Sequence, residues 1–426
     1  MDGFKKVYFV GIGGAGMSAL AGLLSQKGVL VFGSDREKGK NTDLLEEKGV
    51  TVFEGHDADN VPEDIDLLVY SDAVPEDNVE RVKARELGVT ELSYFGALGE
   101  VSKEYKTIAI AGTHGKTTTT AMLAGMLSHI DPTVIVGSIM KETGTNVVLG
   151  KSAYLLVEAC EYNDHFLNLS PTVLAITNIE LDHTDYFKDI EQLLGSYKKL
   201  IAKLPKDGAL ILNTGGVYEQ KLIKDAPCEV IDYKDIEVPE LLVPGAFNKE
   251  NAKVALATAD TLDKNHALHA QKLSEFTGTW RRFEFKGKTH SGALVYDDYA
   301  HHPTAIEKTI VAAKESYPGK KIVVFFHPHL YSRTRDFMKG FAQSLSFADE
   351  AFIAPIFPAR EEFDDVTTNA KLVEEIKKAG GSASVLEGKE MLQSVIEEFD
   401  ADTLIFTMGA GDMYTWIPSY ISTNFG

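Results

Sequence analysis

Residues 107–120 read TIAIAGTHGKTTTT, and this stretch decides the class of fold. The apolar run Thr107–Ala111 predicts a buried β-strand, and the glycine-rich turn after it opens a helix. In such a turn the backbone amides cradle phosphate groups, a lysine reaches the β- and γ-phosphates, and a threonine hydroxyl ligates Mg²⁺. Lys116 and Thr117 occupy those two positions. The stretch therefore predicts an ATP-binding α/β domain.

The turn is a shortened P-loop. The full pattern has a glycine five residues before Gly115, where this chain has Ile110, and the spacing that remains is Gly-x-x-Gly-Lys-Thr. Glycine, lysine and threonine directly after an apolar strand still favour ATP binding over a purely structural turn. The residues expected to bind ATP here are Gly112, Thr113, His114, Gly115, Lys116, Thr117 and Thr118.

A second glycine loop lies near the start of the chain, where residues 11–16 read GIGGAG between a predicted strand and a predicted helix. Its glycines allow a tight turn whose amides approach a pyrophosphate, and the positive end of the helix dipole stabilises that charge. Asp35 closes the next strand, where a ribose-binding carboxylate would lie. Taken alone, this pattern is a dinucleotide fingerprint, and an NAD-linked oxidoreductase is one hypothesis that it supports.

Two acidic clusters follow strands downstream of the P-loop. One runs from Glu158 to His165, and the other from Thr177 to His183. Because open α/β sheets bind ligands at the carboxyl ends of their strands, both clusters are expected to face the same crevice as Lys116. Carboxylates at that edge suit Mg²⁺. Cys160 lies between two acids, which disfavours a thiolate, so we interpret it as a packing residue.

Histidine, aspartate and arginine gather in the last third of the chain, at 297–304 and 327–335. Zinc is disfavoured there because no cysteine cluster or His-Glu-x-x-His helix supports it. Arg333 and Arg335 offer guanidinium groups to a carboxylate or phosphate, and Arg281 or Arg282 could neutralise nucleotide charge.

Apolar β-rich runs alternate with helical stretches along the whole chain, which predicts α/β layers with largely parallel sheets. At 426 residues, about three domains are expected. We place them at 1–103, 104–272 and 273–426, the outer two Rossmann-like and the middle one a P-loop ATPase-like domain. The expected strands are Val7–Val10, Val29–Phe32, Leu67–Tyr70, Thr107–Ala111, Tyr154–Glu158, Val173–Ile176, Ala209–Leu212, Ala293–Tyr296, Ile322–Phe326, Ala351–Ile356 and Thr403–Thr407. The expected helices are Met17–Lys27, Asn251–Thr261, Thr304–Ser316, Asp336–Leu345 and Ala370–Ala379, with a polar stretch after Thr261.

Composition narrows the possible partners. The net charge is −20 and no basic patch offsets it, which argues against nucleic acid and anionic membrane surfaces. The apolar runs are too short to span a membrane, and no secretory leader precedes the first strand. Only two cysteines occur, so a disulfide framework is excluded and a cytoplasmic location is expected.

Taken together, these motifs make the chain resemble the Mur ligase family, and within it the branch that ligates L-alanine. The resemblance covers essentially the whole chain and keeps the order of the motifs. The stretches that carry it are Gly11–Ala19, Ala111–Thr120, Glu158–Phe166, Asn178–Asp185, Gly278–Phe283, Asp297–Thr304, His327–Asp336 and Gly409–Tyr414.

The resemblance implies an activity in peptidoglycan precursor synthesis. ATP would phosphorylate the lactyl carboxylate of UDP-N-acetylmuramate, and the amine of L-alanine would attack the acyl phosphate to give an amide, ADP and phosphate. The first domain would then hold the UDP part of the sugar rather than NAD. The residues implied for it are Gly13, Gly14, Ala15, Gly16, Ser34, Asp35 and Ser71.

The same resemblance assigns roles elsewhere. Lys116, Glu158 and His183 would be catalytic, and Thr117, Glu158 and His183 would hold Mg²⁺, His183 binding a second ion or steering the acyl phosphate. The nucleotide would also contact Asn248, Asn251, Arg282, Asp297 and Asp298. The amino acid would be bound by His301, His329 and Arg333. We expect a monomer or a weak homodimer.

The chain departs from the family pattern at two positions. Phe247 stands where many relatives carry histidine before the asparagine, and Leu330 where many carry arginine. The nearest alternative activity is that of the related tripeptide-recycling ligase, but the 327–336 stretch resembles the alanine branch. A non-catalytic nucleotide-binding module is a third hypothesis, and it predicts ATP binding without turnover.

Overall fold

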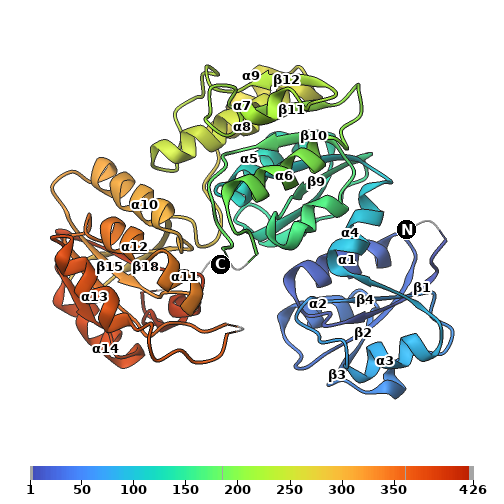
Figure 1. Ribbon diagram of the computed structural model, residues 1–426, viewed down its shortest axis with the longest axis horizontal. Helices are drawn as coiled ribbons and strands as arrows, with labels where there is room; N and C mark the ends of the chain where they lie inside the picture. Colours follow the sequence, from blue (N-terminus) through green and yellow to red (C-terminus); the bar gives the residue numbers. More distant parts are fainter. Residues whose placement is uncertain (1–2, 185, 360, 422–426) are drawn as a thin grey trace. The chain divides into compact units, whose positions relative to one another are not determined.

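The computed structural model describes residues 3–184, 186–359 and 361–421, which form three mostly parallel β-sheets flanked by helices (Figure 1). Asp185, the last residue of one stretch that carries the family resemblance, lies outside the described residues. The three sheets follow one another along the chain, as the three series of predicted strands require, and the three-part α/β fold is confirmed.

The first sheet has five parallel strands in the order β3-β2-β1-β4-β5. Because the strand order reverses between β1 and β4, the carboxyl end of β1 lies at a topological switch point, where open α/β sheets bind ligands. The strands are β1 Lys6–Val10, β2 Leu30–Asp35, β3 Thr51–Glu54, β4 Leu67–Tyr70 and β5 Thr90–Ser93. The helices are α1 Ala15–Gln26, α2 Lys40–Glu46, α3 Val79–Glu86 and α4 Tyr94–Ser102, with the 3₁₀ turn η1 at Ala58–Asn60.

The second sheet has seven strands in the order β12-β11-β10-β6-β9-β7-β8, parallel except for the β7–β8 hairpin. Its central strand β6 lies between β9 and β10, so the loops after all three strands meet at one edge. The strands are β6 Lys106–Ala111, β7 Thr133–Met140, β8 Thr145–Val148, β9 Tyr154–Glu158, β10 Pro171–Ile176, β11 Ala209–Leu212 and β12 Glu229–Asp232. The helical elements are α5 Lys116–Met126, η2 Ser128–Ile130, η3 Tyr162–Asn168, α6 Ile190–Ile201, α7 Gln220–Ile223, α8 Ala246–Leu262 and α9 His266–Ser274.

The third sheet has six strands in the order β13-β14-β18-β15-β16-β17, parallel except for the β13–β14 pair. The strands are β13 Glu284–Lys288, β14 Leu294–Asp298, β15 Lys321–Phe326, β16 Glu350–Ile353, β17 Ala383–Val385 and β18 Thr403–Met408. The helical elements are α10 Pro303–Ser316, α11 Tyr331–Asp336, α12 Met338–Leu345, α13 Asn369–Lys378, α14 Lys389–Val395, η4 Ile396–Glu398 and η5 Met413–Trp416.

Strand β15 shows why the buried strands are apolar without interruption. Ile322, Val324 and Phe326 pack into the core on one face of the sheet, and Val323 and Phe325 pack into the core on the other. Successive side chains of a strand point to opposite faces, so a sheet covered by helices on both sides needs apolar residues at every position. This is the pattern that made such strands predictable.

The chain divides into two compact units. The first comprises residues 1–179, 193–236 and 254–269 and contains the first two sheets, and the second comprises 180–192, 237–253 and 270–426. Residues 180–192 follow β10 of the second sheet but belong to the second unit. The acidic cluster at 177–183 is therefore divided between the units, which the sequence pattern did not indicate.

Some predicted elements differ from those observed. The stretch after Thr261, for which a polar segment and no helix was named, contains the helix α9, whose His269 and Leu273 are buried. The expected helix Asp336–Leu345 is two helices, because Phe337 leaves the helical conformation at φ −105° and ψ 16°. The strand expected at Ala351–Ile356 ends at Ile353.

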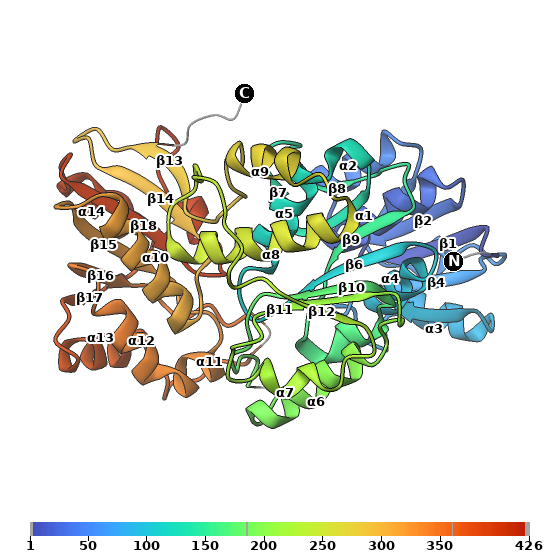
Figure 2. The same ribbon diagram turned by 90° about the horizontal axis from the view of Figure 1, so that it is seen from above.

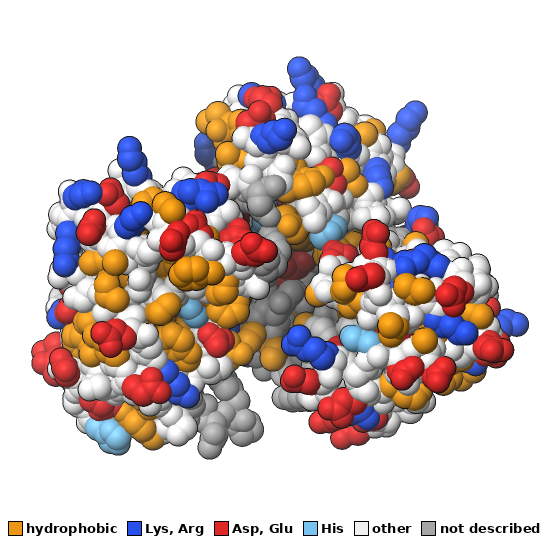
Figure 3. Space-filling model, turned by 60° about the horizontal axis from the view of Figure 1, so that its bottom comes forward, with side chains coloured by type: hydrophobic (Ala, Val, Ile, Leu, Met, Phe, Trp, Pro, Cys, Tyr) orange, Lys and Arg blue, Asp and Glu red, His pale blue; other side chains and the backbone are white. Residues whose placement is uncertain are grey.

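The surface agrees with the composition. On the face drawn in Figure 3, the Lys and Arg side chains are scattered among Asp and Glu side chains and form no separate basic field. Within the described ranges, no helix has both the length and the apolar character needed to cross a bilayer.

Candidate active site

The glycine loop of the first sheet connects β1 to α1 and places bare amides at a helix start. Gly14 is the N-cap of α1, and no side chain caps it. Gly13 N donates a 2.7 Å hydrogen bond to Asp35 Oδ2, so the carboxylate at the end of β2 holds the loop. A Cβ at Gly16 would lie 2.6 Å from the Tyr94 ring, which explains a glycine there. The predicted residues 13–16 thus form one helix N-terminus, which favours anionic ligands.

Ser34 and Ser71 lie near this loop with different surroundings. Ser34 is fully buried and donates a 2.5 Å hydrogen bond to Glu80, which also accepts a 2.7 Å bond from the Tyr8 hydroxyl. His56 pairs with the same Glu80 carboxylate at 2.8 Å. Ser71 follows β4, and its hydroxyl accepts a 3.4 Å bond from Ala73 N. Glu80 and His56 were not predicted, because their contacts join segments far apart in the sequence.

The P-loop lies between β6 and α5, at the centre of the second sheet. Gly115 is the N-cap of α5 with φ 85°, in the left-handed region that favours glycine. The Lys116 ammonium donates hydrogen bonds to the carbonyl oxygen of Gly112 and to both carboxylate oxygens of Glu161, at 2.8 and 3.0 Å. Lys116 thus lies over the loop, where a phosphate would bind.

Glu161 is the site residue that the sequence interpretation did not single out. Its side chain is 3% exposed and that of Lys116 is 16% exposed, so the ion pair is largely removed from water. Burial acts to lower the pKa of Lys116, but Glu161, Cys160 and Glu158 outweigh it and raise that pKa. Lys116 is therefore a cation near neutral pH. The signal in the sequence was the Glu-Ala-Cys-Glu spacing after β9, which places two acids at the same strand end.

Thr117 and Glu158 provide two oxygen ligands side by side. The Thr117 hydroxyl donates a 3.1 Å hydrogen bond to Glu158 Oε2, and Gly137 N donates a 2.6 Å bond to Oε1 of the same carboxylate. A hydroxyl and a carboxylate oxygen beside a phosphate loop form the hard donor set that Mg²⁺ prefers. The predicted pair fits this ion, with phosphate oxygens and water completing its coordination.

Thr177 and Asn178, at the end of β10, brace the P-loop from its other side. The Thr177 hydroxyl donates a 2.5 Å hydrogen bond to the carbonyl oxygen of His114. Asn178 donates to the same carbonyl at 2.9 Å and accepts a 3.0 Å bond from His114 N. These bonds fix the backbone of the loop before any ligand arrives, so the loop is preorganised.

Replacing Gly112 with alanine is expected to lower ATP affinity about 100-fold, the cost of a displacement of about 1 Å. Gly112 has φ 130°, and a Cβ there would lie 2.0 Å from the Thr177 hydroxyl. Calorimetric titration with ATP measures the effect. Gly125→Ala is the matched control, because no atom lies within 4 Å of a Cβ at that helical position. Equal affinity in the Gly112 variant and the control would contradict the expectation.

Cys160 is a buried thiol rather than a nucleophile. Burial and the neighbouring Glu161 raise its pKa to about 11, with Lys116 acting in the opposite direction. The thiol is therefore protonated at neutral pH, and a thiol attacks only as its thiolate, so the packing role of Cys160 stays the prediction that this pKa favours.

Alkylation of Cys160 by iodoacetamide at pH 8 is expected to be about 100-fold slower than that of an unperturbed cysteine. Because the pKa of Cys160 is about 11, its rate should increase about tenfold with each pH unit up to that value. Mass spectrometry of the modified peptide measures the rate, and the urea-unfolded chain is the control. Equal rates in folded and unfolded protein at pH 8 would refute this.

A cluster of charged side chains in the second unit brings together Asp182, Arg333 and His329. Arg333 Nη2 lies 3.4 Å from Asp182 Oδ1, and Arg333 Nη1 lies 3.4 Å from His329 Nδ1. Both contacts join residues that lie in the sequence motifs. Burial opposes ionisation of Asp182, but the neighbouring His183 and Arg333 hold its pKa well below the usual range. Asp182 therefore carries a charge that keeps Arg333 in place.

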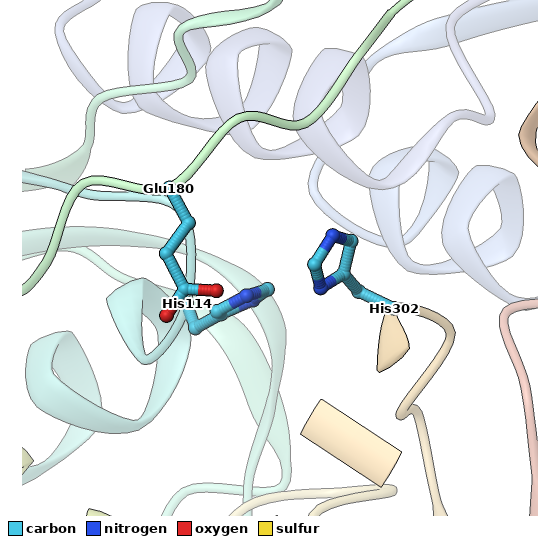
Figure 4. A group of neighbouring side chains, drawn as sticks. All are labelled: His114, Glu180 and His302. Carbon is cyan, nitrogen blue, oxygen red and sulfur yellow. The ribbon is translucent and has the colours of Figure 1, made fainter. Parts of the chain in front are cut away.

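The segment that carries Asp182 is attached to the C-terminal sheet by its neighbours. Thr304 donates a 2.7 Å hydrogen bond to Glu180, and Thr184 donates a 2.8 Å bond to Asp336. A carboxylate oxygen of Glu180 and a ring nitrogen of His302 lie within 4.8 Å of each other (Figure 4). Through these bonds residues 180–184 are held to the start of α10 and to the end of α11 within the second unit.

His183 and His301 belong to the same cluster. His183 has φ 52°, and its backbone N–H donates a 2.7 Å bond to Asp182 Oδ1. His301 Nδ1 lies 2.9 Å from the carbonyl oxygen of Tyr299 and carries the proton of that hydrogen bond. Burial and the nearby Arg333 hold the pKa of His301 well below its usual value, so its ring is neutral at neutral pH. The predicted amino-acid-binding residues His301, His329 and Arg333 thus lie in one cluster.

Arg281 does not have the role that the sequence allowed for it. Its side chain is 4% exposed and forms a 2.7 Å ion pair with Asp297, and it donates to the carbonyl oxygens of Gly409 and Gly411 at 2.6 and 2.9 Å. Its donors are used inside the second unit, so it is not free to neutralise a nucleotide. Arg282 is partly exposed, and its guanidinium lies 4.9 Å from the Tyr299 ring centre.

The two adjacent aspartates that end β14 also have internal partners. Asp297 is bound by Arg281 and by the Thr407 hydroxyl at 2.7 Å. Asp298 accepts 2.8 Å bonds from Phe283 N and Ala300 N, and burial raises its pKa to about 6. The nucleotide contacts predicted for both residues stay predictions.

Asn248 and Asn251 lie on the first turns of α8 and are buried. Asn248 Nδ2 donates a 2.6 Å bond to the carbonyl oxygen of Pro244. Phe247, where a departure from the family pattern was expected, packs against the core of the C-terminal sheet. Leu330, the other departure, is buried with φ 70°.

Unusual backbone conformations coincide with the motifs. Eight non-glycine residues among the described ones have positive φ, and six of them lie in the stretches that carry the family resemblance. Such conformations persist only where surrounding contacts enforce them, and they concentrate at functional sites. The six are Asn163, Asp164, His183, Arg281, Phe283 and Leu330.

Family models match the chain in three consecutive blocks. Residues 6–106 match the Mur ligase family catalytic domain, 110–237 the Mur ligase middle domain, and 281–411 the Mur ligase glutamate ligase domain. With the shortened P-loop and its acidic partners, these matches identify the class, and the chain belongs to the Mur ligase family. The resemblance stated from the motifs is confirmed.

Individual relatives specify the branch. The UDP-N-acetylmuramate–L-alanine ligase of Alkaliphilus metalliredigens is 36% identical over 96% of this chain and 95% of its own length. The crystal structure of the UDP-N-acetylmuramate–alanine ligase from Thermotoga maritima aligns with a TM-score of 0.78 and 29% identity, over 96% of this chain and 97% of that one. A murein peptide ligase from Psychrobacter arcticus aligns with a TM-score of 0.69 and 25% identity, over 97% of each chain.

Proposed function

We propose that the protein is an ATP-dependent amide ligase that joins L-alanine to the lactyl carboxylate of UDP-N-acetylmuramate, a step of peptidoglycan precursor synthesis. The main observation is that Lys116 pairs with the buried Glu161 and that Thr117 donates a hydrogen bond to Glu158. The relatives that match this chain over nearly its full length are named for that activity. The shortened P-loop supplies the phosphate site, and the acids supply the charges that organise it.

The reaction has two steps. An oxygen of the lactyl carboxylate attacks the γ-phosphorus of ATP, the bond to the β-phosphate oxygen breaks, and an acyl phosphate and ADP form. The alanine amine then attacks the acyl carbon, loses a proton, and expels inorganic phosphate. Lys116 stabilises the charge of the transferred phosphoryl group, and the preorganised amides of residues 112–118 hold the other phosphate oxygens. In both steps the chain positions the reactants and stabilises charge.

Mg²⁺ fits the oxygen donors Thr117 and Glu158, which lie 3.1 Å apart. When bound, the ion would neutralise charge on the β- and γ-phosphates. His183 is proposed as a ligand of a second ion or as a group that steers the acyl phosphate. The residues proposed to contact the nucleotide are Asn248, Asn251, Arg282, Asp297 and Asp298. For the two aspartates, a contact with the nucleotide would have to compete with their internal hydrogen bonds.

The UDP-sugar is assigned to the glycine loop of the first sheet. Its diphosphate would bind the amides of Gly13, Gly14, Ala15 and Gly16 at the start of α1, where the helix dipole favours negative charge. Ser34, Asp35 and Ser71 would lie toward the uridine. Asp35 already holds the loop through Gly13, which supports a positioning role for it.

The amino-acid carboxylate is assigned to Arg333, with His301 and His329 beside it. Arg333→Lys is expected to raise the KM for L-alanine about 10- to 100-fold, because lysine cannot reproduce the planar fork of a guanidinium. Initial rates at saturating ATP and UDP-sugar measure it. Arg335→Lys is the matched control, since that side chain is 59% exposed. An equal KM in both variants would remove Arg333 from the amino-acid site.

The proposal is tested with a panel of acceptors. The protein is incubated with UDP-N-acetylmuramate, Mg²⁺-ATP and either L-alanine, L-serine, glycine or the recycling tripeptide, and phosphate release and product mass are recorded. The alanine adduct should dominate. A dominant tripeptide adduct would establish the recycling activity instead, and ATP binding without any product would favour the non-catalytic module. NADH fluorescence titration tests the oxidoreductase alternative, for which neither Lys116 nor Thr117 has a use.

A further inference from the structure

We propose that His129, Asp263 and His269 form a binding site for a divalent transition metal of the zinc class, separate from the P-loop. The three residues belong to the first unit. His129 is in η2, just after α5, and Asp263 follows α8. His269 is in α9, which lies alongside α8 (Figure 2). The site thus joins segments about 134 positions apart in the sequence.

The three side chains converge on one point. One ligand atom from each lies within 4.8 Å of the other two. His129 Nε2 is 2.7 Å from Asp263 Oδ2, and His269 Nε2 is 3.9 Å from the same oxygen. A carboxylate oxygen and two imidazole nitrogens are a donor set that zinc and its neighbours in the first transition row accept.

The opposite nitrogen of each imidazole ring is already held. His129 Nδ1 lies 3.1 Å from the carbonyl oxygen of Met126, and His269 Nδ1 lies 2.7 Å from Asp260 Oδ1. Both oxygens can only accept, so each Nδ1 carries a proton. The Nε2 atoms are the ring nitrogens that face Asp263 and that a metal would take, His129 Nε2 in exchange for its 2.7 Å hydrogen bond to that carboxylate. A second carboxylate or carbonyl that fixes the ring is the usual support of a histidine ligand.

The buried side chain of His269 gives independent support for a bound ligand. Its side chain is 0% exposed, and its Nε2 has no hydrogen-bond partner among the residues that the structure describes. The 3.9 Å separation from Asp263 is too long for a hydrogen bond. A buried imidazole nitrogen without a partner is costly, and a cation between it and Asp263 would satisfy both atoms.

The spacing suits a tetrahedral ion. Metal–ligand distances of about 2.0–2.2 Å at a tetrahedral angle place two ligand atoms about 3.3 Å apart. The two nitrogen–oxygen separations of 2.7 and 3.9 Å lie on either side of that value. His129 and Asp263 are 31% and 35% exposed, so they can adjust, and the fourth position is open to water. A bound ion would cross-link η2 to the turn between α8 and α9.

The test uses the full-length chain without an affinity tag, stripped with a chelator and kept in excess Mg²⁺ to occupy the oxygen-ligand sites. Co²⁺ is added as a spectroscopic probe, and Zn²⁺ is then used to displace it. One Co²⁺ per chain with a visible tetrahedral band is expected, and Zn²⁺ should raise the melting temperature. His129→Ala and Asp263→Asn should lower the affinity at least 100-fold, and Asp260→Asn about 10- to 100-fold through the orientation of His269.

His290→Ala is the matched control, because that histidine is 74% exposed and lies in the second unit. It should bind Co²⁺ like the unmodified chain. The proposal is overturned if the unmodified chain binds no Co²⁺, or if His129→Ala binds it equally well, which would assign the ion to another group. Residues 129 and 263 are partly exposed, so the variants at these positions are expected to fold. Circular dichroism verifies this.

Discussion

Lys116→Met is expected to lower kcat for phosphate release by about 10³-fold or more. The Lys116 ammonium donates a hydrogen bond to the carbonyl oxygen of Gly112 in the P-loop, and methionine keeps the length of lysine but not its charge. A group that stabilises charge on a transferred phosphoryl contributes on this scale. Initial-rate measurement at saturating L-alanine and UDP-sugar tests the expectation. Lys103→Met is the matched control, because that side chain is 55% exposed and its ion pair is with the neighbouring Glu100 on the surface.

A loss of stability in the Lys116 variant could also lower its activity. A second substitution, at Glu161, distinguishes this cause from a loss of catalysis. Its carboxylate is 3% exposed and loses its cation when Lys116 is replaced, so the single variant leaves a buried charge without its partner. Adding Glu161→Gln removes that charge and should recover the melting temperature. Activity should stay low in the double variant. If kcat recovers together with stability, Lys116 has a structural role only.

Arg281→Met should destabilise the second unit by about 3–5 kcal/mol, the cost of breaking a buried ion pair from one side. Arg281 is bound to Asp297 at 2.7 Å and to two carbonyl oxygens, and Asp297 is 1% exposed. The chain has only two tryptophans, Trp280 and Trp416, and both are in the second unit. Denaturant unfolding followed by tryptophan fluorescence therefore reports on this unit alone.

The controls for this variant use an exposed arginine and the ion-pair partner of Arg281. Arg335→Met removes an exposed guanidinium and should change stability by less than about 1 kcal/mol. Arg281→Met combined with Asp297→Leu removes both charges and should recover much of the loss. An Arg281→Met unfolding curve that coincides with that of the unmodified chain would show that the pair does not support the fold.

Buried parallel strands could be predicted closely from the sequence, and half-exposed elements could not. Leu67–Tyr70, Tyr154–Glu158 and Ala209–Leu212 were predicted with the bounds that the structure gives, because they are apolar at every position but the ends. The edge strands Thr90–Ser93 and Ala383–Val385 were not predicted. They are short, partly exposed and mixed in polarity, and only pairing with a neighbouring strand makes them extended.

The candidate site shows the same limit. Residues that act through their own loop, such as Lys116, Thr117 and Glu158, follow from a motif with fixed spacing. Partners that meet through tertiary structure have no local pattern, and Glu80 beside Ser34 is an example. The division of the 177–183 cluster between two units likewise depends on packing rather than on order along the chain.

The Lys116–Glu161 ion pair has a consequence for selectivity among anions. A ligand that binds Lys116 must replace the buried Glu161 carboxylate as the partner of the ammonium group. Binding is therefore an exchange of one anion for another. In the proposed reaction, a triphosphate would bring enough charge and enough amide contacts to make that exchange favourable, whereas inorganic phosphate would bring few of either. After the proposed turnover the same carboxylate would compete with ADP for the lysine and so assist the departure of the product nucleotide.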